Sequence, residues 1–279
     1  MYIIKSTGER QEFDGEKIKR TCLKAKADPE LAERIAKDIA AEVKDGMKTA
    51  DLYRRVMELL AKESPGAALR YDLRNAIFRL GPAGFEFEKY IARVLQAYGF
   101  KTELPPILQG ACTTHEVDIS AAKDGRKMMM ECKLRQSQEI FITIKDTMST
   151  WARFLDLVEG AGIGTCPHFD EVWLVTNSRF SHDSIQYGHC KNMVMLSWDH
   201  PKERPLPAWI EQKGLYPVTV LKSLPPPAFP RLAAENIILL KDFLDLDVIE
   251  VSKKTGLSAS QIDKLIAEAK LILYPTSSP

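Results

Sequence analysis

The chain has 279 residues, of which 45% are hydrophobic and 28% charged, and its formal net charge is +1. This balance is typical of a folded protein with two or three domains, and it excludes a disordered chain and a protein bound to nucleic acid by overall positive charge. No apolar run approaches the roughly 20 residues of a membrane helix, and the first residues lack a signal-peptide pattern. We therefore expect a cytoplasmic protein without a membrane partner. The five cysteines are scattered without CxxC pairs and predict neither a disulfide scaffold nor a zinc finger.

The first part of the chain, residues 1–82, has the pattern of a β-hairpin followed by four helices. Two short β-like runs flank Gly8, and Asp14 is placed to cap the first helix. Asp28, followed by a proline, is placed to cap the second. Apolar stripes continue in "TADLYRRVMELL" and "GAALRYDLRNAIFRL", which predict the third and fourth helices. The following "GPAG" indicates a hinge, so residues 1–82 are expected to form one domain.

The central part, residues 83–224, alternates between helix and strand patterns. "FEFEKYIARVLQAYGF" predicts an amphipathic helix, and a charged hairpin and a short strand, "EIFITI", follow it. A helix with "WARFLDLVEG", a buried strand "EVWLVTN", a helix in "SHDSIQYGHC" and a strand "NMVMLSW" complete the series. This interleaving predicts an α/β domain with a mixed sheet flanked by helices. Residues 225–279 begin with a proline-rich linker and predict a small all-α domain.

The charged hairpin lies within "EVDISAAKDGRKMMMECKLR", residues 116–135. The Asp-Gly pair in its middle predicts a two-residue type I′ turn, which places Asp118 opposite Glu131 and Glu116 opposite Lys133. Because side chains alternate along a strand, these four charged residues share one face. The other face is expected to carry Val117, Ile119, Ala121, Met128, Met130, Cys132 and Leu134.

The two opposed carboxylates predict a cation site. Their β-carbons are expected about 5 Å apart, where like charges destabilise the hairpin. A hard divalent cation removes this repulsion, because it takes two or three carboxylate oxygens and completes its shell with water. Lys133 would lie beside such a cation, where it can orient a hydroxide or stabilise charge that develops on a phosphorane. The alternative is a hairpin whose charged side chains only contact solvent.

Asp118, followed after 12 residues by Glu131-Cys132-Lys133, resembles the D…ExK core of the PD-(D/E)XK nuclease superfamily. The helix before this core and the segment "VWLVTNSRFSHDSIQYG" after it are similar to the Mrr-type restriction endonuclease catalytic domain. The resemblance implies a restriction-endonuclease-like fold in which Asp118, Glu131 and the carbonyl of Cys132 bind Mg²⁺ or Mn²⁺. It further implies that Lys133 positions the attacking water and that Glu88 reaches a second metal or a metal-bound water. The residues expected to contact DNA are Arg126, Lys127, Lys133, Arg135 and Gln136.

The start of the chain resembles the ATP-cone, a hairpin-plus-four-helix domain that regulates ribonucleotide reductases. The resemblance implies an effector site for ATP or dATP, in which Lys5 and Lys17 neutralise phosphates and Asp14 holds a ribose or base edge. Two positions depart from the family pattern, since Ser6 and Pro82 stand where basic residues contact phosphate. The residues that match the pattern are Lys5, Gly8, Phe13, Asp14, Lys17 and Ile18.

The tail "VSKKTGLSASQIDKLIAEAKLI" resembles a helix-hairpin-helix repeat, and a helix-turn-helix explains the same pattern. Taken together, the sequence predicts a Mg²⁺-dependent endonuclease of double-stranded DNA with an adenine-nucleotide sensor in front of it. Because such domains cut one strand per active site, a homodimer is expected. Two alternatives remain open. One is a non-catalytic regulator that binds nucleotide and DNA, and the other is a structure-selective nuclease such as a junction resolvase.

Overall fold

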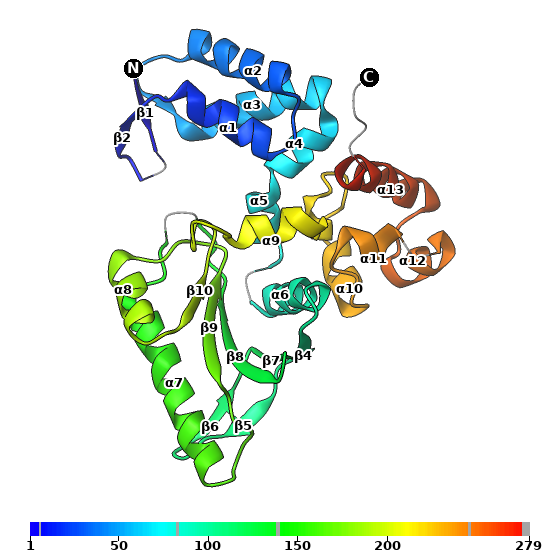
Figure 1. Ribbon diagram of the computed structural model, residues 1–279. Helices are drawn as coiled ribbons and strands as arrows, with labels where there is room; N and C mark the ends of the chain where they lie inside the picture. The colour runs from blue at the N-terminus through cyan, green and yellow to red at the C-terminus, as the bar shows by residue number, and fades with distance from the viewer. Residues whose placement is uncertain (6, 82–83, 138–139, 245–246, 275–279) are drawn as a thin grey trace. The chain divides into compact units, whose positions relative to one another are not determined.

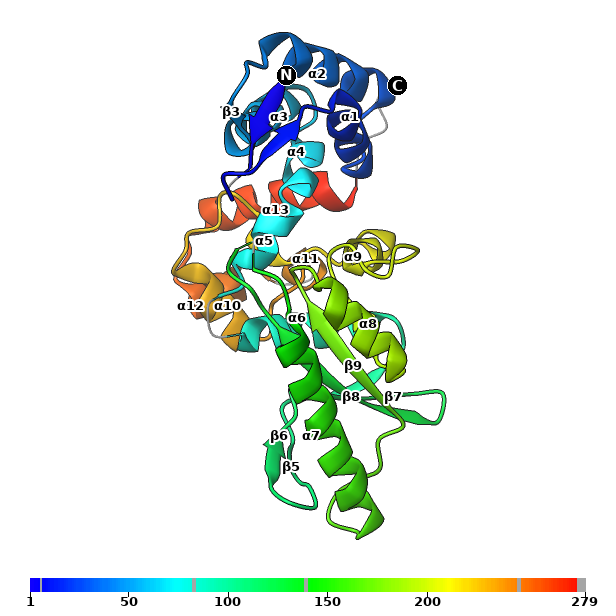
Figure 2. The same ribbon diagram turned by 90° about the vertical axis from the view of Figure 1, so that its left-hand side faces the viewer.

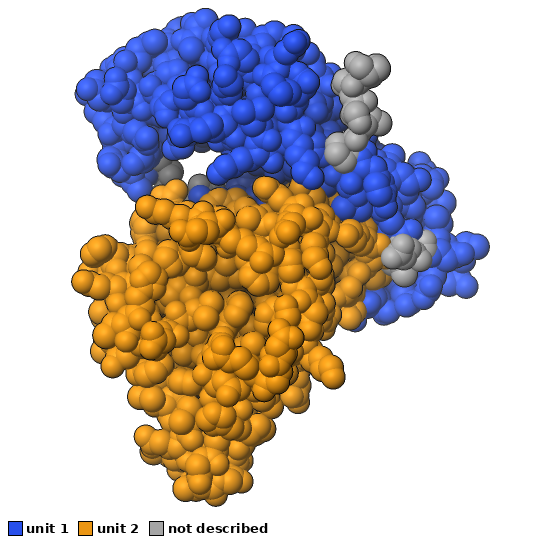
Figure 3. Space-filling model, in the orientation of Figure 1, with its two compact units in different colours: residues 1–76, 218–235, 243–279 blue, residues 77–217, 236–242 orange. Residues whose placement is uncertain are grey.

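The computed structural model describes residues 1–5, 7–81, 84–137, 140–244 and 247–274, and the chain is a mixed α/β protein. It divides into two compact units, coloured separately in Figure 3. Unit 1 consists of residues 1–76, 218–235 and 243–279, and unit 2 of residues 77–217 and 236–242. The sequence predicts three domains with boundaries after residues 82 and 224, whereas the contacts within the structure define two units. None of the described helices is long and apolar enough to cross a membrane.

Unit 1 opens with the expected β-hairpin and continues with helices (Figure 1). Strand β1 (Tyr2–Ile4) pairs antiparallel with β2 (Arg10–Glu12), and β3 (Met47–Lys48) adds a parallel partner to β1. The pattern predicted for the fourth helix is divided at Asp72 into two short helices, α4 and α5. The helices of this segment are α1 (Gly15–Lys24), α2 (Pro29–Glu42), α3 (Thr49–Glu63), α4 (Pro65–Tyr71) and α5 (Leu73–Phe78).

The first two helices begin where the sequence predicts because aspartate side chains cap them. Asp14 accepts a hydrogen bond from the Lys17 amide at 3.2 Å. Asp28 accepts one from the Glu30 amide at 2.8 Å. Each carboxylate thereby satisfies an amide that has no partner within the helix. Apolar residues on the inner faces of α1, α2, α3 and α4 then form one core, which includes Cys22, Ala32, Ile35, Ile39, Val56, Leu60 and Ala67.

The tail helices α10, α12 and α13 belong to the same unit as this core, whereas α11 spans residues of both units. Helix α13 packs on α4, where the buried guanidinium of Arg70 donates to the carbonyls of Ala25, Leu271 and Ile272. The approach is close, since a Cβ on Gly66 would lie 2.3 Å from the Leu271 carbonyl oxygen. The remaining elements of the tail are η1 (Val218–Val220), α10 (Ala228–Ala234), α11 (Leu240–Leu244), α12 (Val248–Thr255) and α13 (Ala259–Leu273).

Unit 2 is built on a five-stranded mixed sheet in the order β10-β9-β8-β7-β4. The three strands β8, β9 and β10 run parallel, whereas β7 is antiparallel to both of its neighbours. Helices α7 and α8 cover one face, and α6 and α9 lie on the other (Figures 1 and 2). The strands are β4 (Lys101–Glu103), β5 (Ile107–Gln109), β6 (Thr114–Glu116), β7 (Ile119–Lys123), β8 (Arg126–Lys133), β9 (Glu171–Thr176) and β10 (Val194–Leu196). The helices are α6 (Phe85–Ala97), α7 (Ile144–Gly162), α8 (His182–Cys190) and α9 (Leu206–Lys213).

The predicted register of the β7–β8 hairpin is confirmed within the ladder of these two strands. The prediction that Glu116 lies opposite Lys133 is wrong, because Glu116 belongs to β6 and pairs with Ile107 of β5. Lys123 pairs with Arg126, and the ladder continues to Ile119 opposite Met130. The turn residue Asp124 has a φ of 51° and the glycine after it 78°, as a type I′ turn requires. Asp118 itself lies one residue before β7 begins, at the end of this ladder.

Two features of the sheet differ from the sequence predictions. Strand β8 is buried on both faces, because α7 packs Phe154 and Leu157 against the face that carries Met129 and Glu131. On the charged face of the hairpin, Glu131 is therefore covered, whereas Asp118 and Lys133 are half-buried and Glu116 stays exposed. The segment "EIFITI" does not form the expected strand in its described residues, since only Ile142 makes an isolated bridge and α7 begins two residues later.

Candidate active site

Three sequence-predicted residues meet where β7 begins and β8 ends. Asp118 lies just before β7, and Glu131 and Lys133 lie in the last part of β8. The Asp118 Oδ2 atom accepts a hydrogen bond from the Cys132 amide at 2.7 Å, which fixes the carboxylate beside the strand. Glu88 lies in the first turn of α6, close enough for the charges of Asp118, Glu116 and Glu131 to act on it. The structure therefore brings Glu88, Asp118, Glu131 and Lys133 together.

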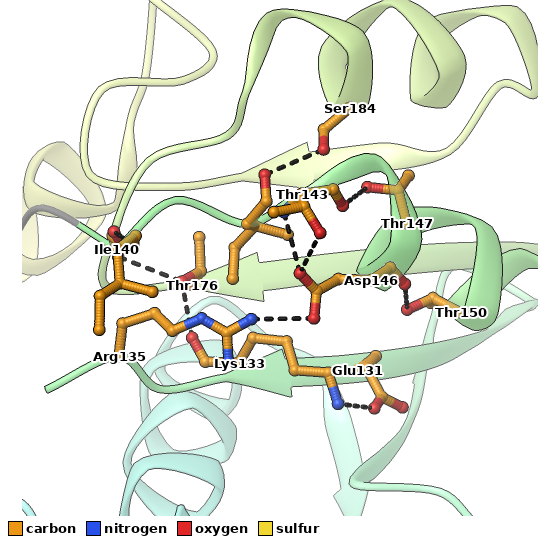
Figure 4. A network of polar contacts seen from close by, with 12 residues as sticks. Glu131, Lys133, Arg135, Ile140, Thr143, Asp146, Thr147, Thr150, Thr176 and Ser184 are labelled. Carbon is orange, nitrogen blue, oxygen red and sulfur yellow. Dashed lines mark hydrogen bonds and ion pairs between the residues drawn. The ribbon is translucent and has the colours of Figure 1, made fainter.

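Glu131 is buried between two cationic side chains. Its Oε1 atom accepts from the Lys133 amino group, which points toward it in Figure 4. Its Oε2 atom accepts from Nη1 of Arg153, a residue of α7 that also reaches the carbonyl of Glu116 at 3.3 Å. The Glu131 side chain is only 4% exposed, and both of its oxygens are paired. A buried carboxylate requires such partners, because an unpaired charge there is costly.

Arg153 is the residue that sequence reasoning missed. It stands one position before Phe154, three after Thr150 and four before Leu157, all of which are buried. A charged residue at this helical spacing lies beside the buried stripe, which is the signal in the sequence that could have pointed to it. Its partner could not be inferred, because Glu131 precedes it by 22 residues and belongs to a different element.

Two acids of the site, Asp118 and Glu88, have raised pKa values. Burial, followed by the charge of Glu131, raises the pKa of Asp118 to about 6. Burial, followed by the charges of Asp118 and Glu116, raises the pKa of Glu88 to about 7. Each shift means that a negative charge is disfavoured where negative charges already gather. A cluster of this kind is typical of functional sites, and a bound cation would relieve it.

A hard divalent cation requires several oxygen ligands gathered around one point. Among the described residues, no three of the His, Cys, Asp and Glu side chains are gathered closely enough to form a ready-made metal site. The oxygens of Asp118 and Glu88 nevertheless fit a hard cation in kind, and the neighbouring carboxylates would attract one. Glu131 can join them only if it leaves Lys133 or Arg153.

The residues expected to contact DNA fall into two groups. Arg126 and Lys127 stand at the opposite end of β8 from Lys133, and Arg126 forms an ion pair with Glu171 at 2.6 Å. The structure therefore does not bring these two residues to the acids, because β8 is fully extended between them. Arg135 and Gln136 follow Lys133 just after β8 ends, at the end of the strand where the acids lie.

Both residues of this second group have partners within unit 2. Arg135 is ion-paired with Asp146 at 2.8 Å, and the two side chains face each other in Figure 4. Gln136 donates to the carbonyl of Gly81 at 3.1 Å. These contacts hold both side chains near the end of β8, where Lys133 also lies.

The predicted nucleotide contacts lie around the hairpin and the start of α1. Lys5 is ion-paired with Glu9 at 2.9 Å, and Asp14 caps α1 and contacts Arg20. Lys17 lies in the first turn of α1. Ser6 and Pro82, the two departures from the family pattern, lie outside the described residues.

A cavity of about 510 Å³ opens between α1 and α2. Asp14 belongs to its lining, whereas Lys5 and Lys17 do not. Three glutamates and a single lysine also line it, a charge balance that disfavours a polyphosphate. The cavity is lined by Glu12, Phe13, Asp14, Gly15, Glu16, Glu33, Ala36, Lys37 and Ala40.

Two family models match parts of the chain, and the first of them covers the N-terminal part of unit 1. The ATP cone domain matches residues 1–76, which confirms the ATP-cone expected from the sequence. The chain thus begins with an ATP-cone domain, and domains of this kind bind adenine-nucleotide effectors. Residues 216–273 match the family described as AF1548-like, C-terminal.

Two relatives extend this result over most of the chain. Over 183 residues the chain is 33% identical to an uncharacterized protein of Archaeoglobus fulgidus, in an alignment that covers 66% of this chain and 99% of that protein. A solved structure titled "Crystal Structure of Protein of Unknown Function AF1548" is 30% identical and superposes with a TM-score of 0.59. It covers 68% of this chain and 97% of its own. The chain therefore belongs to the AF1548-like family.

Proposed function

We propose that the protein is a Mg²⁺-dependent DNA endonuclease of the Mrr type, with its active site in unit 2. The observation that carries the proposal is the convergence of Asp118, Glu131 and Lys133 at one end of the β7–β8 hairpin. The sheet order, with two antiparallel strands followed by parallel ones, supports a restriction-endonuclease-like fold. Glu88 on α6 supplies a fourth group to the same place, where burial and then the charges of the other acids raise its pKa.

The side chains of the site have distinct roles in this proposal. Asp118 and Glu131, with the Cys132 carbonyl, would hold the cation, and Glu88 would bind a second cation or one of the waters. When bound, the cation polarises the phosphoryl oxygen and lowers the pKa of an attacking water. Lys133 would hold that water in line with the phosphorus and stabilise the negative charge that develops on the phosphate. Arg135 and Gln136, at the end of β8, would contact the DNA backbone.

The proposal predicts metal-dependent cleavage by the purified full chain. Supercoiled plasmid, linear duplex and branched DNA should be incubated with Mg²⁺ or Mn²⁺, and EDTA should stop the reaction. Asp118→Asn should lower the rate at least about 100-fold, because it removes a cation ligand and a charge at the reacting centre. Asp124→Asn, at the hairpin turn, is the matched control and should cut like the wild type. Cleavage that persists in EDTA, or that survives Asp118→Asn unchanged, would contradict the assignment.

The ATP-cone makes ATP or dATP the proposed effector of this activity. Lys17 would neutralise a phosphate at the start of α1, so Lys17→Ala should weaken ATP binding about 10-fold, since a hydrogen bond to a charged group contributes about 1.5–3 kcal/mol. Calorimetric titration of the full chain measures this change. Lys24→Ala, at the other end of α1, should leave the affinity unchanged. Equal affinity of all three proteins would remove Lys17 from the nucleotide site.

A second function, non-catalytic regulation by nucleotide and DNA, is favoured by one observation. Both oxygens of Glu131 are paired with cationic side chains, as they would be in a platform that binds no metal. The plasmid assay separates the two functions, because a platform cuts no DNA under any condition. The branched substrates identify a junction resolvase. Two sites are needed to cut both strands, so sedimentation on DNA is expected to show a homodimer.

A further inference from the structure

Two kinds of carboxylate occur in the candidate active site, and they differ in their partners. Glu131 is ion-paired at both oxygens, with Lys133 and with Arg153. Among the described residues, Asp118 and Glu88 form no ion pair: Asp118 accepts from the Cys132 amide, and Glu88 lies in the first turn of α6. The acids whose oxygens are not engaged by a cationic side chain are therefore Asp118 and Glu88, whereas Glu131 is held by Lys133 and Arg153.

Arg153 has the geometry to exchange partners. Its side chain is 29% exposed, and Nη1 alone makes the contacts to Glu131 and to the Glu116 carbonyl. A guanidinium presents five N–H donors in a plane, a geometry that matches the oxygens of a phosphate. A DNA backbone phosphate that reaches Arg153 would thus compete with Glu131 for the same group.

We propose that Arg153 is a positioning residue that couples cation binding to DNA binding. The inference rests on the proposed nuclease function. Without DNA, Arg153 keeps Glu131 away from the cation, so the metal site is incomplete and weak. When a DNA phosphate engages Arg153, Glu131 is released toward Asp118 and completes the set of oxygens. By linkage, DNA and the cation strengthen each other's binding by the same factor.

The charge of the site supports this order of events. A cation that enters beside Asp118 is repelled by Arg153 as long as the guanidinium faces inward. A phosphate at the surface compensates that positive charge and removes the repulsion at the moment when substrate is present. The coupling also limits cleavage to bound DNA, because a site without substrate lacks one of its ligands. Coupling free energies of this kind typically correspond to factors of about 5–150.

The test uses Ca²⁺, a cation with the same preference for oxygen ligands, and measures its binding to the full chain by calorimetry. Each titration is made without DNA and with a short duplex, whose integrity is checked on a gel afterwards. We expect the duplex to tighten Ca²⁺ binding to the wild type about 10-fold or more. Arg153→Gln should bind Ca²⁺ more tightly than the wild type without DNA, and the duplex should add little. Arg153→Lys keeps a cation beside Glu131 and should retain most of the coupling.

Arg179→Gln is the matched control. Arg179 follows β9 at the same end of the sheet, but it is paired with Asp199 and does not contact a site acid. It should behave like the wild type, and circular dichroism should show that all variants are folded. If Arg153→Gln matches the wild type, or if Arg179→Gln gives the same gain, the role of Arg153 is overturned while the nuclease proposal stands. If the wild type binds no Ca²⁺ with or without DNA, the metal site and the proposed function fail together.

Discussion

Lys133→Ala is expected to reduce plasmid cleavage in Mg²⁺ about 1,000-fold, since the loss of one preorganised donor to developing charge typically costs a factor of 10²–10³. Lys133 lies on β8, two residues beyond Glu131, and its amino group contacts that carboxylate. No other described lysine is ion-paired with a site acid. Lys133→Ala should lower kcat more than it raises KM. The reason is that the Lys133 amino group contacts the developing negative charge chiefly in the transition state.

The fold should tolerate this change. The Lys133 side chain is 30% exposed, and Glu131 keeps Arg153 as a partner when the amino group is removed. DNA binding, measured by fluorescence anisotropy without Mg²⁺, should change less than about 10-fold, since one phosphate contact is a small part of the total. Lys123→Ala, a half-buried lysine at the far end of the same hairpin, should cut at the wild-type rate. Undiminished cleavage by Lys133→Ala would end the case for catalysis at this site.

At this site, the sequence predicts features that neighbouring residues determine, and it does not predict contacts between elements that are distant in the chain. The register of the hairpin follows from two turn residues, Asp124 and Gly125, and it holds in the structure. The position of Glu131 within the strand was therefore correct. Its surroundings were not predictable, because the helix that covers it, α7, arrives only after a crossover connection. Arg153 enters the site with that helix, and so the ion pairs of Glu131 belong to tertiary structure alone.

The same distinction applies to the residues expected to contact DNA. Arg126 and Lys133 belong to one basic-looking stretch of sequence, yet seven positions of extended strand separate them. At about 3.3 Å per residue this places them more than 20 Å apart. Proximity in sequence is therefore a poor guide to a shared site when the element is a strand. Arg135 and Gln136 lie near Lys133 because they follow it where β8 ends.

The tail shows the limit of sequence prediction most clearly. Its helices could be recognised from caps such as Ser258, whose side chain forms a capping box with Gln261. Their docking on the ATP-cone could not, because Arg70 and Leu271 are 201 positions apart in the chain. The sequence predicts a separate module there, whereas the contacts place α13 within unit 1. That Arg70 is buried and bound to a distant helix is seen only in the structure.

Arg70→Ala is expected to destabilise unit 1 by about 3 kcal/mol or more, because each buried carbonyl left without a partner costs about 1–3 kcal/mol. The Arg70 guanidinium donates to the carbonyl of Ala25, the residue that ends α1, at 2.7 Å. It also donates to Leu271 and Ile272 in the last turn of α13 at 3.2 and 3.1 Å. The last carbonyls of a helix have no partner within it, so one arginine satisfies two helix ends at once.

Hydrogen exchange of the α13 amides measures this effect separately from the stability of unit 2, which a single unfolding curve of a two-unit chain would not resolve. Protection of α13 should fall in Arg70→Ala while protection of the unit 2 strands stays constant. Arg54→Ala is the control: this side chain is 70% exposed beside Asp51, and its removal should change stability by less than about 0.5 kcal/mol. Unchanged protection of α13 in Arg70→Ala would show that the arginine does not hold the helix.

A glycine on the same helix gives an independent variant of this contact. Gly66→Ala would place a Cβ 2.3 Å from the Leu271 carbonyl oxygen, so the backbone of α13 must move, although alanine is the better helix former by about 1 kcal/mol. Gly162→Ala, at the end of α7, meets no atom within 4 Å and should be neutral or stabilising. Gly66 and Arg70 act on the same helix end. The double variant should therefore lose less stability than the two single variants lose together. Full additivity would mean that the two residues stabilise different contacts, and that α13 is not held as a single rigid element against α4.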